Sequence, residues 1–79
     1  MEPTAAILKL LAERKPKATI CPSEAARLVD PDDWRAQMDD VRRAGRQLAE
    51  KGQITIMQKG EAVDPVEASG AIRYKAAAP

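Results

Sequence analysis

The stretch from Val41 to Gly60, VRRAGRQLAEKGQITIMQKG, changes its periodicity in the middle. Before Gly52 the apolar residues recur at helical spacing, whereas after it they alternate as in a strand with one buried face. Glycine readily adopts the left-handed conformation that ends many helices, so Gly52 is placed to end the first element. A helix followed at once by a strand requires a fold that mixes helices with a sheet, and 79 residues fit one small domain.

Two shorter helices are predicted before this stretch. Residues 3–14 carry apolar side chains at helical spacing, and the helix begins either with Thr4 as its N-cap or with Pro3 in its first turn. Residues 22–30 form the second, for which Ser23 is the N-cap candidate. Both predictions rest on capping and proline chemistry as much as on hydrophobic pattern.

The longest helix is predicted over residues 32–51. Five residues at intervals of four and three form its core-facing stripe: Trp34, Met38, Val41, Gly45 and Leu48. An alternative is a short turn over residues 33–38 followed by a helix that Asp39 caps. Because Trp34 lies on the stripe, we favour a core position for it over the alternative, an exposed anchor for a partner.

The strands are predicted from alternation and from turn residues. Residues 53–59 and 71–75 alternate and should pair as an antiparallel hairpin with a long tip over residues 60–70. Residues 18–21 are too short to stand alone but suit an edge strand of the same sheet. Residues 75–79 are expected to fray.

The resulting order is helix, short strand, helix, helix, strand, long tip and strand. This is the order of a winged helix, an α+β fold, and it predicts a single domain over residues 1–79. The second and third helices would form a helix-turn-helix, and the hairpin would form the wing.

Basic residues mark the predicted recognition helix and the wing. Arg42 and Arg46 are four residues apart, and Arg35 is seven before Arg42, so all three fall near one line of a continuous helix. Such a helix enters the major groove of DNA in helix-turn-helix proteins, where arginine binds phosphates or guanine edges. The candidate nucleic-acid-binding residues are Arg35, Arg42, Arg43, Arg46, Lys59, Arg73 and Lys75.

Two observations favour other interpretations of this basic face. Residues 35–52 carry a net charge of only +2, from five basic and three acidic side chains. Asp39 and Asp40 lie on or near the face and would repel phosphate, so the arginines could simply be solvated. The alternative function is a protein-interaction or oligomerisation module, which Val63 and Val66 at the tip would serve.

The composition argues against catalysis and against a bound cofactor. The chain has no histidine, and its one cysteine, Cys21, cannot form an intrachain disulfide or supply a zinc site alone. We expect Cys21 to be a small buried hydrophobe. Asp30, Asp32 and Asp33 could suggest Mg²⁺, but turn and cap chemistry explains them better. We therefore expect no enzyme, no cofactor and no metal, and we infer no small-molecule partner from the sequence.

The expected setting is the cytoplasm. The N-terminus resembles no signal peptide, no segment has the length of a membrane span, and a lone thiol suits a reducing compartment. The expected partner is DNA or RNA. Because the net charge is only +1, a single copy would bind weakly, so a homodimer is expected if nucleic acid is bound.

The sequence also resembles a family of small bacterial proteins catalogued as a domain of unknown function. Five segments carry the resemblance: Thr19–Glu24 (TICPSE), Trp34–Arg35, Val41–Arg42 with Leu48, Gln58–Gly60 (QKG) with Val63–Pro65 (VDP), and Gly70 with Ile72–Arg73. The family resembles winged-helix domains, which agrees with the fold derived from pattern, and implies no known activity. It directs attention to Arg35, Arg42, Lys59 and Arg73 as a shared surface or as partners of Asp64.

Overall fold

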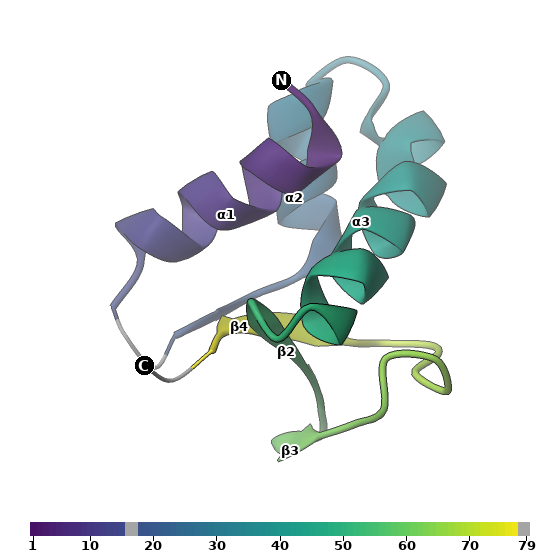
Figure 1. Ribbon diagram of the computed structural model, residues 1–79. Coiled ribbons are helices and arrows are strands. Elements are labelled where there is room, and N and C mark those ends of the chain that lie inside the picture. The colour runs from purple at the N-terminus through teal and green to yellow at the C-terminus, as the bar shows by residue number, and fades with distance from the viewer. Residues whose placement is uncertain (16–17, 78–79) are drawn as a thin grey trace.

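The structure is a computed structural model that describes residues 1–15 and 18–77 (Figure 1). The helical elements are α1 (Pro3–Glu13), α2 (Pro22–Val29), the 3-10 helix η1 (Trp34–Gln37) and α3 (Met38–Glu50). The strands are β1 (Thr19–Ile20), β2 (Ile54–Gln58), β3 (Glu61–Ala62) and β4 (Arg73–Ala76). The α+β class predicted from the sequence is confirmed.

The strands form one antiparallel sheet in the order β1-β4-β2-β3. Tyr74 in β4 lies opposite Ile56 in β2 on one side and Ile20 in β1 on the other. All three are buried, so they share the inner face of the sheet. The predicted hairpin and the predicted edge strand are therefore confirmed.

The three α-helices lie on one side of the sheet, and β3 projects away from them (Figure 1). Ile7 of α1 and Val41 of α3 are fully buried between these layers. Alanine supplies much of the rest, which lets the helices approach closely in a chain with only two aromatic residues. The buried core consists of Ala6, Ile7, Leu11, Ile20, Ala25, Ala26, Val41, Ala44, Leu48, Ile54, Ile56, Ile72 and Tyr74.

The first residues of α1 and α2 follow proline chemistry. The first helical residue is Pro3 in α1 and Pro22 in α2, because a proline has no amide proton that the first turn would leave unpaired. For α1 the predicted alternative with Pro3 in the first turn is confirmed, and Thr4 is not the N-cap. The predicted N-cap Ser23 is wrong, because it lies inside α2. In α2 the N-cap is Cys21, whose amide donates to the Glu24 carboxylate at 2.8 Å.

A single helix over residues 32–51 is also wrong, because the structure divides it into η1 and α3. The tighter winding of η1 lets Trp34 lie over Arg27 of α2, whose guanidinium stands 4.5 Å from the ring centroid. The alternative with a break comes closer, but Gln37 and not Asp39 precedes the helix. Trp34 is half-buried and packs against the edge of the core, so its predicted core position holds only in part.

The tip of the hairpin contains a short strand and two turns. Lys59 and Gly60 both have positive φ, 53° and 81°, as in the tight turns that join antiparallel strands, and they fold β3 back onto β2. Further along, the Asp64 carboxylate accepts the amide of Val66 at 2.8 Å and holds a second turn.

The sequence also predicted how α3 ends and where the chain frays at its C-terminal end. Gly52 has the expected positive φ of 76° after α3. The expected fraying of residues 75–79 is wrong for Lys75 and Ala76, which belong to β4 and pair with residues of β2. Residues 78–79 lie outside the described residues.

Candidate nucleic-acid interface

A groove of about 570 Å³ opens where the starts of α2 and α3 meet the β2–β3 turn and the start of β4. Three of the predicted basic residues line it: Arg42 from α3, Lys59 from the turn and Arg73 from β4. Its other walls include Met38, Met57 and Ile72. The groove therefore joins cationic side chains from three separate elements to an apolar surface.

Backbone and hydroxyl oxygens fix the two groove arginines in place. The Nη2 group of Arg42 donates to the carbonyl oxygen of Gly70 at 3.1 Å. The Nη2 group of Arg73 donates to the carbonyl oxygen of Thr19 at 3.1 Å, and its Nε donates to the Thr19 hydroxyl. Neither arginine forms an ion pair among the described residues, so no carboxylate there neutralises it, and each has several unused donors.

Arg46 lies one helical turn beyond Arg42 and shares a second, smaller depression with it. The same two guanidinium groups act on the buried phenol of Tyr74. Burial raises the pKa of Tyr74 to about 12, while the positive charges of Arg42 and Arg46 oppose that rise. Arg42 therefore belongs to both depressions and connects Arg46 to the groove.

The structure separates three predicted residues from this group. Arg43 is ion-paired with Asp40 within α3, with 3.1 Å between Nη1 and Oδ1. Arg35 lies in η1 and stacks on Trp34 at 4.4 Å from the ring centroid, so it does not continue the line of Arg42. Lys75 is half-buried on β4 and does not line the groove.

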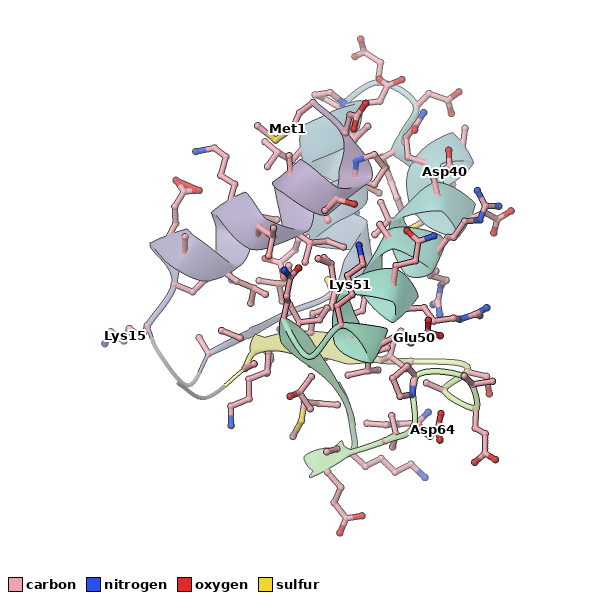
Figure 2. All side chains as sticks on the ribbon, in the orientation of Figure 1. Met1, Lys15, Asp40, Glu50, Lys51 and Asp64 are labelled. Atoms are coloured by element: carbon pink, nitrogen blue, oxygen red, sulfur yellow. The ribbon has the colours of Figure 1, made fainter. Side chains whose placement is uncertain are left out.

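The acidic residues predicted at this end of α3 are exposed. Asp40 marks the start of α3, at the end of the helix away from Glu50 and Lys51 (Figure 2). Its ion pair with Arg43 lies within α3 and joins residues three apart, so Asp40 neutralises one of the predicted contact arginines. Such exposed pairs contribute little to stability, about 0.3–0.5 kcal/mol.

Sequence reasoning missed the apolar half of the groove. Met38 was assigned to the core stripe, yet it is half-buried and borders the groove. Strand alternation places Met57 on the outer face of the sheet, and this alternation is the sequence signal that could have identified it as a surface residue. Cys21 is half-buried and not fully buried as expected, and its Sγ lies 3.0 Å from the Ser23 hydroxyl on the same wall.

The acidic cluster at Asp30 has a structural explanation. Its carboxylate accepts the amides of Asp32 at 3.1 Å and Asp33 at 3.2 Å, which is the turn chemistry predicted for it. In residues 1–15 and 18–77, no three metal-binding side chains are grouped as a metal site would require. None of the helices in those ranges combines the length and apolar character that crossing a bilayer demands.

Comparison with known families adds one result. Residues 2–77 match the family model described as "Protein of unknown function (DUF3253)". The chain belongs to the DUF3253 family. The resemblance noted from the sequence is thereby confirmed over nearly the whole chain. No curated protein matches the chain.

Proposed function

We propose that this DUF3253 protein is a nucleic-acid-binding module of the winged-helix type, acting as a small transcriptional regulator. In this proposal α2, η1 and α3 form the helix-turn-helix, and the β2–β4 hairpin with β3 at its tip forms the wing. The order of elements and the position of the helices on one face of the sheet support the assignment.

One observation carries the proposal. Arg42, Lys59 and Arg73 come from a helix, a turn and a strand, yet they line one groove, and none is ion-paired among the described residues. A fold that only needed solubility would have no reason to hold unpaired cations together, because like charges repel. Phosphate groups of nucleic acids are common ligands of arginine and lysine side chains.

We propose a smaller set of contact residues than the sequence suggested. Arg43 is ion-paired and Arg35 is stacked on Trp34, so we assign contact to Arg42, Arg46, Lys59 and Arg73. If each neutralises one phosphate, the slope of log affinity against log salt is about −4 per protomer. Because four contacts give modest affinity, we propose that a homodimer binds.

Fluorescence anisotropy with generic duplex DNA and duplex RNA at two salt concentrations tests the proposal. Arg42→Gln and Arg46→Gln should each weaken binding and reduce the salt slope by about one. Lys51→Gln is the matched control, because it removes the same charge at the opposite end of α3 (Figure 2). Affinity that is independent of salt, or equal losses in all three variants, would contradict the proposal. Sedimentation of the complex gives the number of protomers bound.

A second candidate function is protein interaction through the tip. Val66 is 68% exposed and lies in the loop between β3 and β4, where its apolar side chain is available to a partner. A chain of net charge +1 is also a weak ligand for a polyanion. Charge reversal at Arg42 and Arg46 separates the two candidates. A partner that remains bound to that variant but is lost with Val66→Asp would favour protein interaction.

A further inference from the structure

We propose that the groove is also a binding site for a small amphipathic anion, meaning an alkyl chain or another small apolar body that carries one carboxylate, sulfonate or phosphate group. This goes beyond nucleic-acid binding, because the ligand is a free small molecule and the groove holds it without DNA or RNA. The proposal rests on the volume of the groove, its apolar walls and the fixed positions of its cations.

The volume suits a small molecule. At about 570 Å³ the groove falls within the range of small-molecule pockets, which are roughly 300–1,000 Å³. Such pockets have mainly apolar walls and a few placed polar groups, and this groove has both. Phosphate binding alone would need the cations but not a hollow with apolar walls.

The apolar walls come from three elements that meet only in the folded chain. Met38 stands at the start of α3, Met57 lies on the outer face of β2, and Ile72 precedes β4. The thioether side chains are flexible and polarisable, so they adapt to aliphatic or aromatic bodies of varied shape. Ile72 is only 6% exposed and therefore forms a firm base beneath them.

The cations are held ready for an acidic group. The bond from Arg42 to Gly70 and the bonds from Arg73 to Thr19 fix both guanidinium groups before any ligand arrives. Each guanidinium has five donors, so each retains at least three for an anion. Side chains that are already ordered lose less entropy on binding, which favours affinity. Lys59, which is exposed in the β2–β3 turn, adds a third cation to the groove.

Methionine methyl groups give a direct test, because the chain has only three methionines. Met38 and Met57 line the groove, whereas Met1 is 58% exposed at the chain start and lies outside it. The protein is labelled with ¹³C at its methionine methyl groups and titrated with monomeric decanoate, without nucleic acid. The expected result is a saturable shift of the Met38 and Met57 signals with the Met1 signal unmoved.

Two control ligands test the two halves of the site. Decyltrimethylammonium has the apolar body but the opposite charge, and acetate has the charge without the body. Both should leave the Met38 and Met57 signals unmoved at concentrations where decanoate saturates them. Equal shifts with the cationic ligand, or a Met1 shift as large as the others, would overturn the proposal.

Variants then assign the acidic group to the cations. Arg42→Gln should weaken decanoate binding about tenfold, since it removes a charge-assisted hydrogen bond. Lys59→Gln is a second variant and should also weaken binding. The Lys59 side chain forms no hydrogen bond with other described residues, so this substitution disturbs little else. Lys51→Gln, far from the groove, should not. Undiminished binding by Arg42→Gln and Lys59→Gln together would overturn the proposal. Because this titration contains no nucleic acid, a negative result would not affect the anisotropy test of nucleic-acid binding.

Discussion

The ring of Tyr74 in β4 packs directly against the backbone of Gly45 in α3. A β-carbon at position 45 would lie 2.5 Å from both Cζ and Oη of Tyr74, well inside van der Waals contact. Glycine therefore occupies the middle of α3 because the sheet approaches the helix there, although glycine disfavours helix by about 1 kcal/mol relative to alanine. This contact fixes the distance between α3 and the sheet that forms one wall of the groove.

Replacing Gly45 by alanine should destabilise the protein despite the better helix propensity. Tyr74 is fully buried, so its ring has no free space to move into, and the overpacking should cost about 1–3 kcal/mol of unfolding free energy. Urea denaturation measures the change. An increase in stability, as helix propensity alone predicts, would show that the two elements can move apart.

A double-mutant cycle assigns that cost to the tyrosine. Tyr74→Leu removes the ring atoms that a new β-carbon would meet, so Gly45→Ala should be much less costly in the Tyr74→Leu background. If the effects of the two substitutions on the free energy of unfolding are additive, the cost of Gly45→Ala does not come from contact with Tyr74. A comparison of Gln47→Ala with Gln47→Gly is the control for helix propensity, because Gln47 is exposed in α3.

The ionisation of Tyr74 should be displaced to high pH. Burial raises its pKa from 10.0 to about 12, while the charges of Arg42 and Arg46 partly oppose the shift. The phenol of the unfolded chain ionises at lower pH than the buried phenol of the folded chain. The free energy of unfolding is therefore unaffected by Tyr74 below pH 10 and falls as the pH rises from 10 towards 12. The chain has one tyrosine, so tyrosinate absorbance follows this group alone. Arg46→Gln should move the midpoint higher, and a midpoint at the ordinary value would refute the burial.

Removing the hydroxyl of Tyr74 should stabilise the fold at neutral pH. Its Oη is buried and has no hydrogen-bond partner within the described part of the chain. An unpaired buried hydroxyl costs stability, so Tyr74→Phe should raise the free energy of unfolding by about 1 kcal/mol. Thermal denaturation measures the change. A loss of stability would mean that the hydroxyl binds a water molecule or another group.

Glu24 should contribute stability that acid removes. Partial burial raises the pKa of its carboxyl, but the hydrogen bonds from Arg14, at 2.6 Å, and from the Cys21 amide outweigh burial and hold the pKa below its ordinary 4.5. A lowered folded pKa gives stability that is full above pH 4.5 and lost as the pH falls through the folded value. Urea midpoints between neutral and acid pH should therefore fall more steeply for the wild type than for Glu24→Gln. Parallel curves would refute this.

Lys59→Asn should separate stability from binding. Lys59 has a positive φ of 53°, which asparagine tolerates better than lysine, and asparagine before glycine favours this turn. The variant should gain roughly 1 kcal/mol of stability. It should nevertheless bind duplex DNA more weakly, because it lacks a charge in the groove. Stronger binding with greater stability would show that Lys59 limits folding and makes no contact.

The sequence alone indicated most of the secondary structure. The alternation around Ile54 and Ile56, the left-handed glycine at Gly52 and the β-prone pair at Thr19 and Ile20 are local signals, and the structure contains each of them. Errors arose where two local signals competed. Ser23 is a good capping residue, but the neighbouring Pro22 took the first helical position and moved the cap to Cys21.

The break before α3 shows the limit of local pattern. Trp34 has the spacing of the core stripe, so periodicity favoured one helix. The stack of its ring between Arg27 and Arg35 involves a residue of α2, and no periodicity within residues 32–51 carries that information. Arg35 was consequently placed on the wrong element, although it is exposed as a residue of the basic face would be.

The sequence determined which residues are charged, which alternate and where helices stop, because these properties depend on near neighbours along the chain. Only the tertiary structure decided which cations gather. Arg42 is positioned by Gly70, 28 residues away, and Arg73 by Thr19, 54 residues away. The groove exists because β4 returns between β1 and β2 and brings those residues beside α3. Contacts over such separations depend on how the elements pack, which the spacing of residues within each element does not encode.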